Sequence, residues 1–249
     1  MSTASPPNGP SAIDAVEPPA ATTESDASGR ALLIDYSYTG QARRMSDAMA
    51  DELRAAGVDV TQAAVAFTDR RYVDRFKTFP MHNAFLDVLR MLPAQVLRRT
   101  GEIQIPPEAQ SGDYDLVCVL SPTWWLTTNM PTRSFLKAPS TDALLRDTMF
   151  TDVVVCRRYW GNNHRTVRKL GMERGGTYVE GIHFAYAGGQ VRSLLSLISY
   201  LGSGDYRERY LGLRIPKTNL TEAQLDDGRA FARRLATHIQ TTASARRED

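Results

Sequence analysis

Residues 37–41, Ser-Tyr-Thr-Gly-Gln, form a hydroxyl-rich turn between an apolar segment and a segment with helical spacing. The first N–H groups of the following helix and its partial positive charge suit a phosphate, and the glycine lets the backbone approach a ligand closely. The turn lacks the lysine of an ATP-binding loop and the three glycines of a dinucleotide site, so it favours a terminal monophosphate. An ordinary capped turn is the alternative. The residues predicted to hold the phosphate are Ser37, Tyr38, Thr39, Gly40, Gln41 and Ala42.

Two later loops, 121–131 and 156–164, add aromatic and amide side chains after apolar segments. Trp124 and Trp125 are unusual in a loop unless they cover something flat, because aromatic faces stack on conjugated rings. In the second loop, CRRYWGNNH, asparagine side chains and nearby amides could read the edge of a heterocycle. Packing of the tryptophans against segment 67–113 is the alternative. The residues predicted to line a conjugated ring are Pro122, Thr123, Trp124, Trp125 and Leu126 on one side, and Arg158, Tyr159, Trp160, Gly161 and Asn162 on the other.

Among the four histidines, His164 alone falls in one of these loops, and an imidazole exchanges protons near neutral pH. Together with Tyr159 it is the candidate catalytic acid or base. A helix-start residue or a hydrogen-bonding partner is the alternative for His164. His82, His183 and His238 lie in separate predicted elements, and no paired spacing of metal-binding residues occurs, so no metal site is predicted. The sequence also lacks the G-x-S-x-G turn of one large hydrolase class.

The elements that must position these loops alternate along the chain. Apolar runs predict five strands, at 31–36, 58–66, 114–121, 151–156 and 177–187. Helical spacing predicts four helices, at 41–56, 131–137, 163–174 and 222–240. The last helix begins with the Thr221–Gln224 spacing of a capping box. This alternation indicates an α/β fold with a parallel sheet covered on both faces. Two longer segments, 67–113 and 188–220, are either decoration on the sheet, walls of a substrate pocket or an oligomer surface.

The bulk composition limits the function classes. The chain has 249 residues and a net charge of +2, and its arginine pairs are scattered, so no nucleic-acid partner is expected. Segment 1–29 is rich in Pro, Ala, Ser and Thr and lacks aromatic and basic residues. It is predicted to be a disordered tail and not a secretory signal. No run of 18 apolar residues occurs, so neither a membrane span nor a membrane partner is expected.

Cys118 and Cys156 lie inside apolar runs and are expected to be reduced core residues of a cytoplasmic protein. The length fits one domain, predicted over 30–240 with the two insertions inside it, followed by a flexible end at 241–249.

In their order along the chain, the three loops resemble those of flavodoxin-like FMN proteins. SYTGQA is similar to that family's phosphate-binding turn, and SPTWWLTTNMP and CRRYWGNNH fall where it places two loops around the isoalloxazine ring. The resemblance implies FMN as cofactor and a doubly wound, five-stranded parallel sheet of order 2-1-3-4-5. A closer resemblance, through DYSYTGQ, FLDVLRMLPAQVL and RRYWGNN, is to flavodoxin-family proteins identified as dialkylresorcinol condensing enzymes. It implies a partner ketosynthase, whose cyclohexanedione product the flavoprotein aromatises. Segment 188–220 departs from the family pattern.

The loops and the resemblance together predict an FMN-dependent oxidoreductase of secondary metabolism that aromatises or reduces a small cyclic ketone, phenol or quinone. One alternative is an FMN or quinone reductase in which NAD(P)H reduces the flavin. Another is an electron carrier, although such carriers are small and strongly acidic, and this chain is basic outside its first 29 residues. The last alternative is a scaffold protein that keeps the fold but binds no flavin. The apolar run VRSLLSLISYL would serve a homo-oligomer interface or a core.

Overall fold

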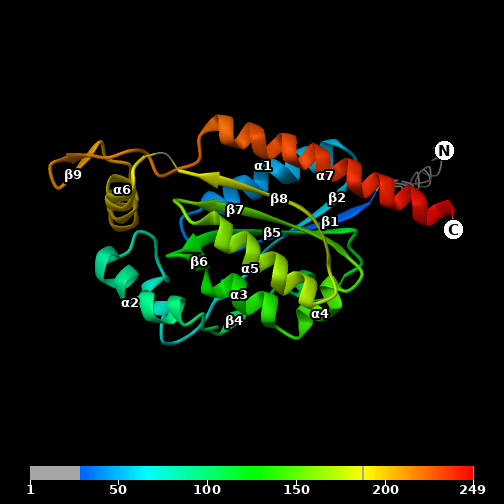
Figure 1. Cartoon of the computed structure of the whole chain (residues 1–249), viewed down its shortest axis with the longest axis horizontal. Coiled ribbons are helices and arrows are strands. Elements are labelled where there is room, and N and C mark those ends of the chain that lie inside the picture. Colours follow the sequence, from blue (N-terminus) through cyan, green and yellow to red (C-terminus); the bar gives the residue numbers. More distant parts are fainter. Residues whose placement is uncertain (1–28, 111, 187, 249) are drawn as a thin grey trace, which may run out of the picture.

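The computed structural model describes residues 29–110, 112–186 and 188–248, so the tail predicted for 1–29 lies outside the described residues except for Gly29. The centre is a parallel sheet whose strands follow the order β2-β1-β5-β7-β8 (Figure 1). These strands are β1 (Arg30–Asp35), β2 (Asp59–Ala64), β5 (Leu116–Trp124), β7 (Met149–Cys156) and β8 (Thr177–Ala185). A short strand, β6 (Thr127–Thr128), pairs antiparallel with the end of β5. The predicted strands and their order, 2-1-3-4-5, are confirmed.

Helices cover both faces of the sheet, as strands that are apolar on both sides require. One face is covered by α1 (Gln41–Ala55) and α7 (Glu222–Glu248). The other is covered by α3 (Met130–Lys137), α4 (Ser140–Leu145) and α5 (Trp160–Glu173) (Figure 1). Met45, Met49 and Leu53 recur at helical spacing on α1 and are fully buried against the first face. Phe135 and Val167 are buried against the second, so the sheet lies between two hydrophobic cores.

Local sequence sets the ends of the helices. Gly57 follows α1 with a φ of 82°, a left-handed conformation that glycine adopts without a side-chain clash. The predicted capping box forms at α7, because Gln224 N–H donates to Thr221 Oγ1 at 3.2 Å and Thr221 N–H donates to Gln224 Oε1 at 3.1 Å. The sequence pattern predicts an end at residue 240, but α7 continues to Glu248, through most of the segment predicted to be flexible.

The helical parts of the two insertions lie beyond the end of the sheet at which β8 ends (Figure 1), whereas Ile103, Ile105 and Ala109 of the first insertion pack against the second face of the sheet. The first contains η1 (Val73–Arg75), α2 (Ala84–Val96), β4 (Ile103–Gln104), which pairs with β3 (Ala66–Phe67), and η2 (Pro107–Ala109). The second contains α6 (Gln190–Ser203), β9 (Arg209–Tyr210) and β10 (Leu213–Arg214). Met81 and Ala84 pack against Ile198 and Leu201, which joins α2 to α6. The insertions therefore support each other next to the carboxyl ends of the strands.

Both cysteines of the chain are free and buried, as predicted, Cys118 in β5 and Cys156 at the end of β7. Burial raises the pKa of the Cys118 thiol far above its usual range, so this residue stays an unreactive thiol of the core. Within the described ranges, no helix is both long enough and apolar enough to cross a membrane.

Candidate functional site

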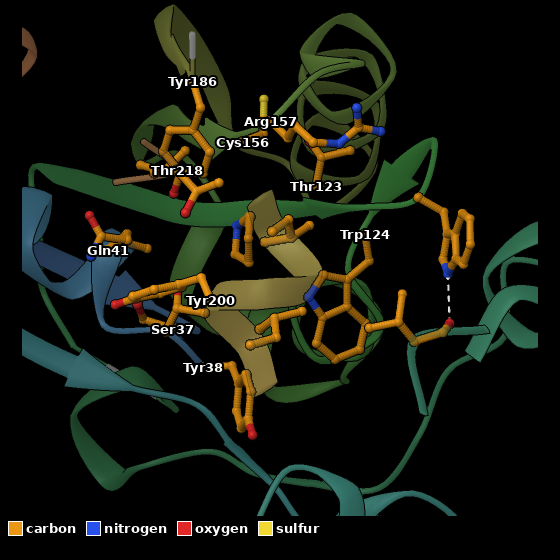
Figure 2. Close-up of a pocket in the computed structure, with 18 of the residues that line it drawn as sticks. Ser37, Tyr38, Gln41, Thr123, Trp124, Cys156, Arg157, Tyr186, Tyr200 and Thr218 are labelled. Carbon is orange, nitrogen blue, oxygen red and sulfur yellow. Dashed lines mark hydrogen bonds between the residues drawn. The ribbon is translucent and has the colours of Figure 1, made fainter. Parts of the chain in front are cut away.

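A cavity opens at the carboxyl ends of β1, β5 and β7, which is where open α/β sheets bind ligands (Figure 2). The space between its walls, with its open mouth included, is about 1090 Å³, a size suited to a small-molecule cofactor. Its walls come from the turn after β1, the end of β5, the start of the β7–α5 loop, and the two insertions. The predicted cofactor residues that line it are Ser37, Tyr38, Thr39, Gln41, Ala42, Pro122, Thr123, Trp124, Trp125 and Arg158.

The turn after β1 presents hydrogen-bond donors to the cavity. Ser37 Oγ accepts a hydrogen bond from Arg43 N–H at 3.1 Å, which fixes the hydroxyl beside the first turn of α1 and leaves its proton for a ligand. Gly40 precedes α1 with a φ of 75°, a conformation that favours glycine. The N–H groups of Gln41 and Ala42 have no hydrogen-bond partner within the described residues. This donor set, two amides and hydroxyls at a helix N-terminus, fits a phosphate.

An ion pair between the buried Asp35 and the partly exposed Arg43 lies directly behind this turn. Asp35, at the end of β1, is 2% exposed, and Arg43 Nη2 lies 2.8 Å from its Oδ1. The contact is close but lacks hydrogen-bond geometry, since this oxygen has no hydrogen-bond partner. Burial raises the pKa of Asp35 to about 6, because the loss of solvation outweighs the attraction of Arg43.

The opposite side of the cavity is aromatic and is supported by the first insertion. Trp124 lies face to face with Phe76, with ring centroids 4.8 Å apart and planes 14° apart. Tyr38 meets Phe76 edge-on at 5.3 Å, and its hydroxyl donates to a carbonyl oxygen of the first insertion at 2.6 Å. Trp125 Nε1 donates to Val88 O at 3.0 Å. The tryptophans thus pack against segment 67–113, which was the alternative, and they also line the cavity; that they cover a conjugated ring stays a prediction.

The second insertion forms the cavity wall next to the turn after β1. Figure 2 shows Tyr200 of α6 and Thr218 on the same side of the cavity as Ser37 and Gln41, with Trp124 across from them. The main chain after β10 is fixed there, because Leu220 N–H donates to Gln41 Oε1 at 2.9 Å. Helical apolar residues also build ordinary cores, so no local motif marks the insertion residues as cavity walls. The cavity-lining residues of the two insertions, which the sequence did not single out, are Phe76, Met81, Val88, Met91, Leu194, Leu197, Tyr200, Leu201 and Thr218.

The charge on the described residues that line the cavity is entirely positive. Arg157 and Arg158 are its charged side chains, and no acidic residue or histidine lies among them. Arg157 Nη1 donates to Gln190 O and to Ser193 Oγ, each at 3.1 Å, and Arg158 Nη2 donates to a carbonyl oxygen before α6 at 3.1 Å. Burial lowers the pKa of Arg157, but a guanidinium stays charged at neutral pH. The cavity therefore suits an anionic ligand.

Two further lining groups hold their protons. Burial raises the pKa of the Cys156 thiol to about 11 and that of the Tyr38 phenol to about 12. Both groups are protonated at neutral pH; Tyr38 donates its proton to the first insertion, and the Cys156 thiol proton remains for a ligand. The described lining thus offers donors and cations, with no side chain poised to remove a proton near pH 7.

The predicted residues that follow Arg158 turn away from the cavity. Tyr159 has a φ of 63°, which reverses the chain at the start of α5. As a result, Trp160 stacks on His183 of β8, with ring centroids 3.7 Å apart, and Asn162 Nδ2 donates to a carbonyl oxygen of the turn after β5. The predicted ring-lining residues outside the cavity lining are Leu126, Tyr159, Trp160, Gly161 and Asn162.

His164, the predicted catalytic acid or base, also lies outside the cavity lining. Its Nδ1 is hydrogen-bonded to the carboxylate of Asp152, a fully buried residue of β7. The Tyr178 hydroxyl donates to the other oxygen of this carboxylate at 2.8 Å. The structure thus shows the alternative reading of His164, a hydrogen-bonding partner. Across the described ranges, no three His, Cys, Asp or Glu side chains gather closely enough to hold a metal ion.

The strand order and the position of the cavity define a flavodoxin-like α/β protein. No protein-family model and no curated protein sequence matches the chain. Among solved structures, it is similar to a flavoprotein from Lactobacillus acidophilus NCFM in complex with FMN, with 19% identity, 62% of this chain and 93% of that one covered, and a TM-score of 0.43. It is also similar to flavodoxin 1 from Bacillus cereus, with 12% identity, coverage of 84% and 98%, and a TM-score of 0.47. These are distant likenesses, and the strand order and lining residues define the fold and the site.

Proposed function

We propose that this protein is an FMN-dependent oxidoreductase that acts on a small cyclic ketone, phenol or quinone. The observation that carries the proposal is the division of one cavity into a donor-rich turn at a helix N-terminus and an aromatic side, with arginines and no acid among its described lining residues. A monophosphate attached to a flat conjugated ring matches both parts. FMN, when bound, supplies the hydride-transfer chemistry, and the chain binds and orients the reactants.

The residues that would hold each part of FMN follow from this division. The amides of Gln41 and Ala42 and the hydroxyls of Ser37 and Thr39 would hold the phosphate. Trp124 and its neighbours at the end of β5 would lie beside the ring. The space between α2 and α6 would then hold the substrate, because its walls are apolar and a pure electron carrier needs no such enclosure.

The specific reaction that we propose is the aromatisation of a cyclohexanedione supplied by a partner ketosynthase. Aromatisation removes two electrons and two protons from the ring: one proton leaves to water when the dione ionises, and both electrons leave with the other proton as hydride, which FMN would accept when bound. The described lining offers no base, but a cyclic 1,3-diketone is acidic enough to ionise in water without one. Its enolate would complement Arg157 and Arg158, and the protonated Cys156 thiol would donate a hydrogen bond to it.

An anaerobic titration followed by stopped-flow absorbance tests these proposals. The full chain is expected to bind FMN at one site and to have its flavin reduced on mixing with a 5-alkylcyclohexane-1,3-dione. Reduction by NAD(P)H, with reoxidation by a quinone, would support the reductase alternative in its place. Flavin that binds but exchanges electrons only with a protein partner would leave an electron carrier, and a chain that does not bind FMN would overturn the cofactor proposal.

A further inference from the structure

The outward face of α2 is apolar along its whole length. Its exposed apolar side chains lie within about a third of the helix circumference at the helical repeat of about 100° per residue. We call this surface the α2 stripe: Phe85, Leu86, Leu89, Val96 and Leu97, which are 44% to 62% exposed. Isolated exposed apolar residues are ordinary, but a contiguous set of this kind marks a docking surface.

Two polar residues of α2, Asp87 and Gln95, point inward, so the stripe is not the face that packs against the rest of the protein. Asp87 is buried and its Oδ1 lies 3.5 Å from Arg75 Nε. Gln95 is fully buried and its Oε1 accepts a hydrogen bond from Arg133 Nη2 at 3.0 Å. The helix is therefore fixed by polar contacts on its inner side, and its apolar side faces outward.

The border of the α2 stripe is cationic. Arg90 lies at its edge with its side chain 61% exposed, and Arg98 and Arg99 are exposed directly after it. Phe85 and Arg207 line one hollow, which joins the stripe to the second insertion. The β9–β10 hairpin of that insertion adds two exposed apolar side chains, Leu211 and Leu213, at the same end of the molecule (Figure 1), with exposed charges of both signs in and beside it; these are Arg209, Arg214, Asp205 and Glu208.

We propose that the α2 stripe docks onto an anionic lipid surface. Apolar side chains on one helix face enter the boundary between headgroups and acyl chains, and neighbouring arginines bind lipid phosphates. In this arrangement α2 lies on the membrane surface and does not cross the bilayer. The proposal therefore needs no apolar run long enough to span a membrane.

Other occupants fit this surface less well. In a symmetric pair of chains that packs α2 against α2, Arg90, at the middle of the helix, would approach Arg90 of the second copy, and like charges would oppose the contact. Residues 1–28 have few large apolar side chains, and none is aromatic, so they could not cover the stripe; they are Met1, Ile13 and Val16.

Docking would bring the cavity next to the lipid. Val88 and Met91 lie on the inner side of α2 and line the cavity, so a single helix would separate the bilayer from the space between α2 and α6. An apolar ring dissolved in the membrane would reach the cavity without crossing water. The docking itself does not depend on FMN, so the two proposals fail separately.

Vesicle flotation with the full chain tests the docking. The probes are vesicles of phosphatidylcholine alone and of phosphatidylcholine with about a third phosphatidylglycerol, at about 0.1 M and about 1 M salt, which screens surface charge strongly. Leu89→Glu places a charge in the stripe, and Met172→Glu on α5, where Met172 is 52% exposed, is the matched control. We expect the parent chain to bind the anionic vesicles. This binding should fall about tenfold or more in Leu89→Glu and at high salt, and it should be unchanged in Met172→Glu.

Three results would overturn this proposal. They are no binding to the anionic vesicles, equal loss in both variants, and equal binding to neutral vesicles at both salt concentrations. Light scattering after size exclusion completes the test: a dimer that Leu89→Glu dissociates, without vesicle binding by the parent chain, would assign the stripe to a second copy. Circular dichroism of both variants checks that the fold is retained.

Discussion

The indole N–H of Trp125 donates to the main-chain carbonyl of Val88 at 3.0 Å, which joins the turn after β5 directly to α2. Trp125 has a φ of 55°, an uncommon conformation for so large a residue. The side chains of both residues line the cavity. This contact therefore sets the separation between the edge of the sheet and the wall that the first insertion provides.

Replacing Trp125 by phenylalanine removes this donor while keeping an aromatic side chain. We expect the free energy of unfolding to fall by about 1 kcal/mol, the usual contribution of such a hydrogen bond, and the KM for substrate to rise because α2 is held less firmly. Urea denaturation and steady-state kinetics measure the two effects. Trp160→Phe is the matched control, since Trp160 is 42% exposed and outside the cavity lining. Equal effects in both variants would contradict the prediction.

Thr39 lines the cavity in the turn that precedes α1. Thr39→Val keeps the shape and removes a donor to the phosphate. Because a hydrogen bond to a charged group contributes about 1.5–3 kcal/mol, we expect FMN to bind at least tenfold more weakly, with stability unchanged. Flavin fluorescence titration measures this effect. Thr177→Val is the control at the exposed start of β8, at the other end of that strand from the cavity. An unaltered affinity in Thr39→Val would remove Thr39 from the phosphate site.

Local sequence was enough to predict the parts of the site that depend on neighbouring residues. The order of strand, turn with Gly40 and helix placed the donors of residues 37–42 at the carboxyl edge of the sheet, and the structure has them there; that they hold a phosphate stays a prediction. The wall residues did not, because Met91 and Leu197 belong to two insertions whose mutual packing has no local signature.

The misplaced ring-lining residues have a conformational cause. Trp160 is in the right loop, but the positive φ of Tyr159 turns its side chain onto His183. A non-glycine residue in this region of conformational space is rare, and nothing in its sequence context predicts it. His164 follows on the same helix and is directed to Asp152 instead of the cavity.

Asp35 makes stability depend on pH. Its pKa of about 6 in the folded chain lies above its ordinary value of 3.8, so the native state holds this proton more tightly than the unfolded chain. Asp35 therefore contributes stability below pH 3.8, and this contribution is lost as the pH rises through 6. The ionised, buried carboxylate costs about 3 kcal/mol relative to its protonated form.

Asp35→Asn should remove this dependence. We expect the variant to be more stable than the parent at pH 7, by up to about 3 kcal/mol, and the difference to shrink as the pH falls from 6 towards 4. Urea denaturation across this pH range measures it, with Asp51→Asn as the control because the Asp51 side chain is 80% exposed. A variant less stable than the parent at pH 7 would mean that the ion pair with Arg43 outweighs the burial of Asp35.

Replacing His164 tests whether this residue has a structural role or takes part in the chemistry. Its ring is hydrogen-bonded to the fully buried Asp152 and lies outside the cavity lining, so His164→Gln should leave FMN affinity and the rate of flavin reduction close to those of the parent. Loss of a hydrogen bond to a buried carboxylate should lower the free energy of unfolding by about 2 kcal/mol. His238→Gln, on the 50% exposed His238 of α7, controls for loss of an imidazole. A flavin reduction rate that falls tenfold in His164→Gln, with FMN affinity and stability intact, would return His164 to the chemistry and require a substrate path from the cavity to α5.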